Sequence, residues 1–275
     1  MSHLTPLLAD AILLATLGTE HSDGAARVAL AFASRGQGPM EALGVLAPLP
    51  PDFFAYAAHF QDIDPQRRAA LSQAIAEQMA RISASDATPK VEIGDSAEVI
   101  VNEATARGAA LIALCLVHHG VVDRLLGAEL AIQILHSGKV PVLTVPPAAT
   151  GLMERIVIAT DFSPAATRVA HLAMRLAKDG AAIHLVHTND WLAESVLPSR
   201  RRVYEAGVQA LLEQLATTLP LPPYAQVEQH LLHGVADSAI LTFAAARRAD
   251  LIAMAADGAE PVVRRADCSV LIAKE

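Results

Sequence analysis

Long hydrophobic runs and a basic N-terminus are both missing from this 275-residue chain. No run of about 18 apolar residues occurs, so we expect no transmembrane helix. This holds although 53% of the residues are hydrophobic and the mean hydropathy is +0.36. The first residues, Met1-Ser-His-Leu-Thr5, lack the basic start of a secretory signal. Together these absences predict a cytoplasmic protein.

Clustered positive charge is also missing. The formal net charge is −8, and only residues 200–202 form a run of three arginines. We interpret that group as the solvated face of a predicted helix. Proteins that bind nucleic acids or anionic membranes present basic patches, so neither partner is expected.

Cysteine is scarce, since Cys115 and Cys268 are the only two. They occupy non-equivalent positions and form no CxxC motif. We expect buried, reduced thiols. A thiol-based, redox-responsive module stays open as an alternative function.

Catalytic and metal-binding patterns are absent as well. No Ser-His-Asp spacing or nucleophile elbow occurs, so we expect no enzyme. His118 and His119 are adjacent, but no third ligand stands at a zinc spacing from them. We therefore expect no metal site. Glu228 and Asp250 show no paired-carboxylate context, which is a further reason to expect no catalysis.

Four further histidines lie on predicted strands. His184 and His187 are three residues apart, as are His230 and His233. Residues three apart on a strand face opposite sides of the sheet, because the side-chain period is two. We interpret all four as structural.

The clearest positive feature is a strand, a polar turn and a helix start within residues 155–164. A short apolar, β-branched run is followed by Thr160, Asp161 and Ser163, and then by Pro164 at a favoured first helical position. Ligands of parallel sheets bind beyond the carboxyl ends of strands. Thr160, Asp161 and Ser163 are therefore candidate ligand-binding residues. Alternatively, Asp161 only caps the helix, while Ser163 is better explained as a cap than as a nucleophile.

The chain carries an internal duplication. Residues 12–17 match residues 156–161 at an offset of 144 (156 − 12), and residues 94–114 align with residues 234–254 at an offset of 140 (234 − 94). Two matches in the same order indicate two copies of one domain, at residues 1–147 and 152–275. The prolines and glycine of residues 146–151 predict a linker.

Strands alternate with helices in both copies, which predicts an α/β fold of two tandem, doubly wound domains, each with a five-stranded parallel sheet. The second copy is shorter between its last two strands. Residues 114–141 of the first copy span 27 positions, and the aligned residues 254–269 span 15, a difference of 12 (27 − 15). The short connector leaves room for about two helical turns, around residues 260–265.

The sequence Ala159-Thr-Asp-Phe-Ser-Pro164 resembles the first strand and turn of the universal stress protein family. Ala249-Asp-Leu-Ile-Ala-Met254 is similar to the family's fourth strand, and Pro141-Val-Leu-Thr-Val145 to its last. The resemblance covers both halves and implies the tandem form, with an adenine-nucleotide alpha-hydrolase-like fold. It also implies that the last strands of the two halves pair, which would give an internal pseudo-dimer. A homodimer stays open.

ATP-binding members carry a loop of the form G-x2-G-x9-G-[ST] after the fourth strand, where backbone N–H groups approach the phosphates. When the first copy is laid on this pattern, Gly127 takes the last glycine, and Gly120 is a further loop glycine. Both are candidate ligand-binding residues. The other relevant positions of the first copy are apolar: Leu17 in place of the first-strand Asp, and Leu114, Val117 and Ala128 in the loop.

The second copy departs from the pattern in the opposite way. Asp161 stands where the family's nucleotide-contacting Asp belongs, but the shortened loop carries Asp257 and Glu260. Each carboxylate would repel a phosphate by about 1 kcal/mol at 4 Å even in bulk water. In the family each domain holds its own nucleotide, so we expect ordinary ATP binding to be lost in both copies.

These observations predict a non-enzymatic stress-response or regulatory protein with no cofactor, acting through an unknown protein partner or a small ligand. An ATP- or AMP-binding stress protein with weak hydrolysis is the alternative.

Overall fold

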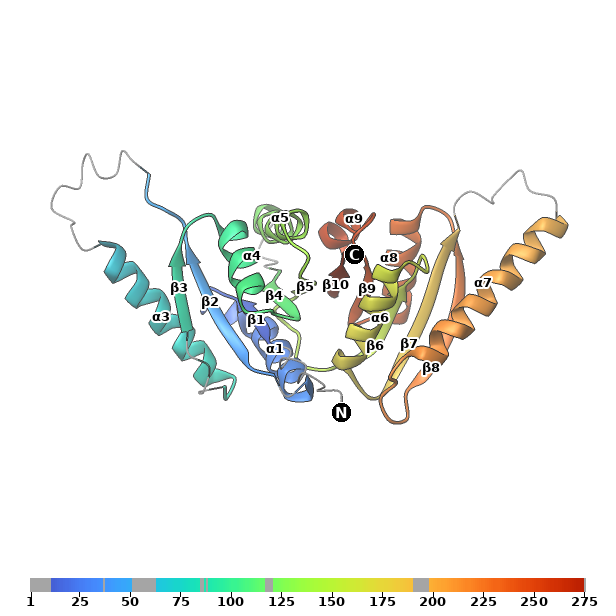
Figure 1. Cartoon of the computed structure of the whole chain (residues 1–275), viewed down its shortest axis with the longest axis horizontal. Coiled ribbons are helices and arrows are strands. Elements are labelled where there is room, and N and C mark those ends of the chain that lie inside the picture. Colours follow the sequence, from blue (N-terminus) through green and yellow to red (C-terminus); the bar gives the residue numbers. More distant parts are fainter. Residues whose placement is uncertain are drawn as a thin grey trace, which may run out of the picture. The chain divides into compact units, whose positions relative to one another are not determined.

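The computed structural model describes residues 11–36, 38–50, 63–84, 87, 89–116, 121–189 and 198–274 (Figure 1). For residues 121–126 and 198–199 only the backbone is described. The chain divides into two compact units, Met1–Gly151 and Leu152–Glu275. Each unit is described by itself below.

The first unit is a doubly wound parallel sheet with the strand order β3-β2-β1-β4-β5. Its strands are β1 (Ile12–Ala15), β2 (Met40–Leu46), β3 (Pro89–Ile93), β4 (Leu111–Cys115) and β5 (Val142–Val145). Its helices are η1 (Glu20–Ser22, a 3-10 turn), α1 (Asp23–Gly36), α3 (Ile63–Arg81), α4 (Ser96–Ala106) and α5 (Val121–Ser137).

Burial explains why the central strands are apolar throughout. Four consecutive residues of β4, Leu111–Leu114, are buried, and so are the first three residues of β1. Both faces of such a strand are covered by helices, so no polar alternation is needed. The right-handed crossovers place α1 and α3 on one face of this sheet, and α4 and α5 on the other.

The second unit repeats this plan with the order β10-β9-β6-β7-β8, again all parallel. Its strands are β6 (Met153–Ala159), β7 (Ala177–Asn189), β8 (Gln226–His233), β9 (Leu251–Ala255) and β10 (Ser269–Ala273). Its helices are α6 (Pro164–Leu176), α7 (Pro198–Thr218), α8 (Ala236–Arg247) and α9 (Glu260–Arg265). Since β6 to β10 take the places of β1 to β5, the predicted duplication of one fold is confirmed.

The short connector of the second unit forms α9, with the bounds expected from its length. The Ala/Leu/Arg-rich pattern after Pro164 predicts a helix over residues 164–178, but α6 ends at Leu176, since Ala177 is extended and already belongs to β7. In the described parts of the chain, no helix is long and apolar enough to cross a membrane.

Candidate functional site

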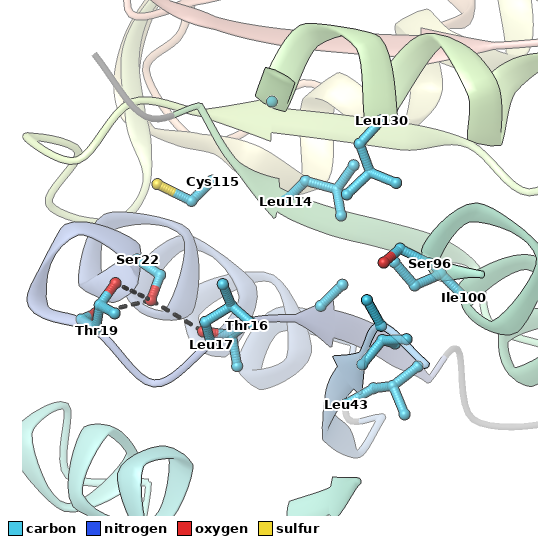
Figure 2. Close-up of a pocket in the computed structure, with 14 residues that line it drawn as sticks. Thr16, Leu17, Thr19, Ser22, Leu43, Ser96, Ile100, Leu114, Cys115 and Leu130 are labelled. Atoms are coloured by element: carbon cyan, nitrogen blue, oxygen red, sulfur yellow. Dashed lines mark hydrogen bonds between the residues drawn. The ribbon is translucent and has the colours of Figure 1, made fainter. Parts of the chain in front are cut away.

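A pocket of about 370 Å³ lies at the carboxyl end of the sheet in the first unit (Figure 2). It is bounded by the ends of β1, β2 and β4, by the loop that follows β1, and by α4 and α5. The chain leaves β1 toward β2 on one side and β4 toward β5 on the other, so the strand order reverses here. Ligands of doubly wound proteins bind at such a switch point.

The pocket walls are mostly apolar. Leu43, Val45 and Ala47 line it from β2 and its continuation, because alternate residues of a strand share one face. Ile100 of α4 and Leu130 of α5 line it as well. We did not expect these residues from the sequence. Residues 43–47 are all apolar or glycine, so the sequence does not show which of them face the pocket.

Three residues that the resemblance aligns with nucleotide-binding positions lie in this pocket. Leu17, Leu114 and Gly127 all line it, and Leu17 is 58% exposed in spite of its apolar side chain. Gly127 lies in the second turn of α5, which begins at Val121, rather than in a loop before the helix. Gly120 and Val117 are outside the described residues. Among the described residues, apolar side chains therefore stand in the pocket where the resemblance implies polar contacts to a nucleotide.

Three of the hydroxyl groups that line the pocket, those of Thr16, Thr19 and Ser22, lie close together, and Ser96 lies apart from them. The Thr16 hydroxyl donates to Oε1 of the buried Gln78 at 2.8 Å and lies 2.9 Å from the Ser22 hydroxyl. Nε2 of Gln78 donates to Ser22 Oγ at 2.8 Å, and Ser22 donates to the Thr19 carbonyl at 2.7 Å. Because these groups already satisfy each other, they offer few donors to a ligand.

Cys115 also lines the pocket, and its thiol donates to the His21 carbonyl at 3.0 Å. Burial raises the pKa of Cys115 to about 12. Burial, followed by the nearby Asp250 and Asp267 carboxylates, raises the pKa of Cys268 to about 12 as well. Both cysteines are free. A redox-responsive thiol needs thiolate character near neutral pH, so these environments do not favour the redox alternative.

The candidate residues of the second unit lie at the turn between β6 and α6. The Ser163 hydroxyl accepts a hydrogen bond from the Ala166 N–H at 3.1 Å and is the N-cap of α6. Asp161 Oδ1 accepts from the Ser163 N–H at 2.9 Å, which closes an Asx turn, and the Asp161 side chain is exposed. The alternative that Asp161 caps this helix is therefore wrong. Thr160 is buried and accepts from the Phe162 N–H at 2.9 Å.

We expect Asp161→Asn to change the free energy of unfolding by less than about 0.5 kcal/mol, because Asn also closes Asx turns and the side chain is exposed. Ser163→Ala should cost about 1 kcal/mol, since it removes the N-cap. Urea unfolding of both variants measures the difference. A larger loss for Asp161→Asn than for Ser163→Ala would show that the Asp161 charge itself stabilises the fold.

The five candidate residues thus fall at different places. Gly127 lies in the pocket of the first unit, and Gly120 is outside the described residues. Thr160, Asp161 and Ser163 share one turn of the second unit.

Comparison with known proteins identifies the fold. No curated protein matches the chain. A universal stress protein from Archaeoglobus fulgidus DSM 4304 is similar over 97% of both chains, with a TM-score of 0.62 and 21% identity. A putative universal stress protein from Pseudomonas aeruginosa UCBPP-PA14 has a TM-score of 0.65 and 15% identity, over 97% of this chain and 93% of the other. Identities this low show the fold alone.

A sequence model of a single family matches the chain twice. The model of the universal stress protein family matches residues 9–146 and again residues 153–274. The two matches correspond to the two units that share one strand order. The chain therefore belongs to the universal stress protein family, in which it carries two tandem copies of the domain.

Proposed function

We propose that this chain is a non-enzymatic regulatory stress protein whose first unit binds a small, mainly apolar ligand in place of ATP. The observation that carries the proposal is the pocket at the switch point, with Leu17 and Leu114 at the family's nucleotide positions. Its volume of about 370 Å³ falls within the range of small-molecule sites.

The charge of its triphosphate makes ATP a poor ligand for this pocket, which favours an apolar ligand instead. A phosphate transferred to an apolar site loses its hydration and needs donors in return. Two of the hydroxyls that line the pocket, those of Thr16 and Ser22, are occupied by Gln78 and by the Thr19 carbonyl. The Gly127 backbone N–H lies inside α5, so it is committed to the helix.

The second unit offers a different chemistry. Asp161 is exposed, and its carboxylate does not cap α6. A carboxylate accepts hydrogen bonds from hydroxyl or amine groups, such as a ribose or the edge of a nucleobase. Thr160, Asp161 and Ser163 therefore support a second, weaker candidate site. ATP or AMP binding with weak hydrolysis stays the alternative function.

The setting is proposed from the sequence and the family. We place the protein in the cytoplasm, without nucleic acid or membrane partners. There it acts through a small ligand, or through a partner protein whose binding depends on whether the ligand is bound. Pairing of the last strands of the two halves, and a homodimer, stay predictions.

The pocket is tested with the neutral apolar dye Nile red and with Mg-ATP. We expect about one equivalent of dye to bind the wild-type protein, and Val45→Phe to weaken this binding at least about tenfold, because the larger side chain fills the pocket. Fluorescence titration measures the dye. Calorimetry with Mg-ATP should show no affinity tighter than about 100 μM, or roughly −5.5 kcal/mol.

Val203→Phe is the matched control. Val203 lies on α7 of the second unit and is 74% exposed, so the same substitution there should leave dye binding unchanged. Equal dye affinity in Val45→Phe and wild type would remove the pocket as the binding site. A micromolar affinity for Mg-ATP would instead support the nucleotide alternative.

A further inference from the structure

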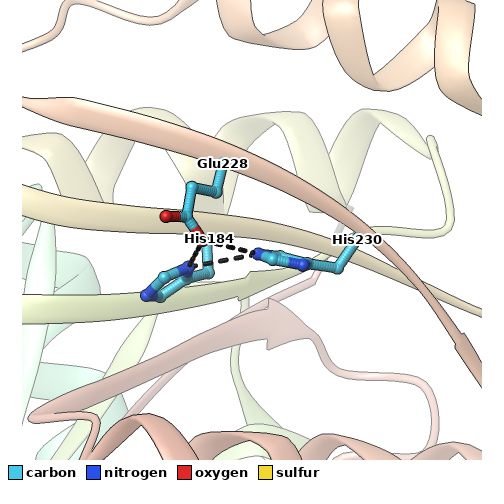
Figure 3. Close-up of side chains that lie close together, drawn as sticks. All are labelled: His184, Glu228 and His230. Carbon is cyan, nitrogen blue, oxygen red and sulfur yellow. Dashed lines mark hydrogen bonds and ion pairs between the residues drawn. The ribbon is translucent and has the colours of Figure 1, made fainter.

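Two histidines and a glutamate from neighbouring strands of the second unit lie together (Figure 3). His184 comes from β7, and Glu228 and His230 come from β8. Nδ1 of His184 lies 3.2 Å from Nε2 of His230. Oε2 of Glu228 lies 3.4 Å from the first nitrogen and 3.3 Å from the second. The three atoms form a nearly equilateral triangle.

The register of two parallel strands produces this grouping. His184 is paired with Glu228 across β7 and β8, and His230 follows Glu228 by two residues on the same face. His184 and His187 do face opposite sides, as expected, since His184 meets Phe243 of α8 and His187 meets Tyr204 of α7. Spacing along a single strand, however, gave no indication of the contact across strands.

The triangle has the dimensions of one face of a tetrahedral zinc site. Zinc binds imidazole nitrogen at about 2.0–2.1 Å and carboxylate oxygen at about 2.0–2.2 Å. Neighbouring ligand atoms of a tetrahedron are then about 3.3–3.5 Å apart, by the same bond lengths. The three distances therefore match those between ligands of one ion, which would replace the hydrogen bond between the two imidazoles.

We propose that His184, Glu228 and His230 form a binding site for a divalent transition-metal ion, with zinc as the best match. Two imidazoles and one carboxylate are donors that zinc accepts, and imidazole excludes magnesium and calcium as the preferred ions. The His184 side chain is 6% exposed and the Glu228 side chain 53%. The site is thus anchored inside the unit and open to solvent at Glu228, where water would complete the coordination.

The protonation of the two histidines fits this role. Burial lowers the pKa of His184 and of His230, and the charge of Arg247 lowers both further, against the opposing effect of Glu228. Lowered pKa values keep both imidazoles neutral at neutral pH, which ligation requires. Zinc binding should weaken as the pH falls and protons compete for the nitrogens.

Arg247 of α8 opposes the ion. Its Nη1 lies 3.6 Å from the same Oε2 of Glu228, and its guanidinium lies 5.2 Å from the centre of the Phe243 ring. Phe243 covers the two histidines, at ring-centre distances of 5.6 Å from His184 and 4.7 Å from His230. A bound cation must share the carboxylate with Arg247 or displace it, so Arg247 limits the affinity.

The test uses the full-length protein, stripped of metal with a chelator and then titrated with zinc sulfate. Bound zinc is counted by mass spectrometry of the gel-filtered protein, and cobalt replaces zinc for absorption spectra of the coordination. We expect His230→Asn to bind one equivalent of zinc fewer than the wild type, or to bind that zinc at least about 100-fold more weakly. His233→Asn is the matched control, since His233 is an exposed residue three positions along the same strand. It should bind as wild type does.

Arg247→Met separates a metal site from a structural ion pair. Removing a charge this close to the ligand oxygen should tighten zinc binding at least about fivefold. Equal zinc content in His230→Asn and wild type would overturn the proposal. Unchanged or weaker zinc binding in Arg247→Met would also overturn it, because the ion would then not lie on Glu228.

Discussion

Gly18→Ala is expected to lower the free energy of unfolding of the first unit by about 2–5 kcal/mol. Gly18 follows β1 with a φ of +75°, a left-handed conformation that costs an L-residue about 1–2 kcal/mol. A Cβ at this position would also lie 2.4 Å from the Ala74 carbonyl carbon and 2.6 Å from the Ile75 nitrogen, both backbone atoms of α3. Overpacking of this kind adds about 1–3 kcal/mol, because a helix backbone has no rotamer with which to yield.

Gly258→Ala separates the cost of the left-handed backbone conformation from the cost of overpacking. Gly258 has the same φ of +75°, but a Cβ there would meet no atom within 4 Å. Gly258→Ala should therefore lower the free energy of unfolding only by the conformational cost, about 1–2 kcal/mol. Urea unfolding gives the free energies, and hydrogen exchange of peptides from β1 and β9 assigns each loss to its unit. Equal losses in the two variants would mean that α3 can move away from the turn.

Gln78→Met is expected to cost the first unit about 2–4 kcal/mol. Gln78 is fully buried and bridges Thr16 and Ser22, with which its amide makes two hydrogen bonds of 2.8 Å. Methionine has a similar length but provides no donor and only a weak acceptor. Two buried hydroxyls would lose a partner, and each such group costs about 1–3 kcal/mol. Denaturant unfolding measures the loss.

Gln73→Met provides the control on the same helix. Gln73 is exposed and bonds only to Glu77, so its replacement should change stability by less than about 0.5 kcal/mol. The triple variant Thr16→Val, Ser22→Ala, Gln78→Met should recover part of the loss, since removing both partners of a hydrogen bond costs less than removing one. If the triple variant lost more than the single one, packing rather than hydrogen bonding would explain the effect.

The fold was predictable because repeated strand sequences and the apolar runs of buried strands can both be recognised in short segments of the sequence. The repeated strand sequences gave two copies of one order, and the short connector of the second copy limited α9 to two turns. The start of β7 at Ala177 was not predictable in the same way. The alanine-rich segment before it suits a helix locally, and only the pairing of Ala177 with Met153 of β6 decides against a longer helix.

The candidate sites were only partly predictable. The resemblance placed Leu17 and Gly127 at one site, because it fixes their spacing, but an apolar pocket there was not predicted. Val45 could not, since its role depends on which helices cover β2. The grouping of His184 with Glu228 depends on register between strands more than 40 residues apart in the chain (228 − 184 = 44). Such contacts belong to the tertiary structure and have no local pattern.

The place of Gly127 within α5 also limits how the first unit could be redesigned. A helix that begins at Val121 has bonded the backbone groups of its second turn to one another, so an aspartate introduced at position 17 would still face a closed helix. A phosphate site at this place would need both a polar side chain at position 17 and an unwound start of α5. One substitution cannot supply both changes.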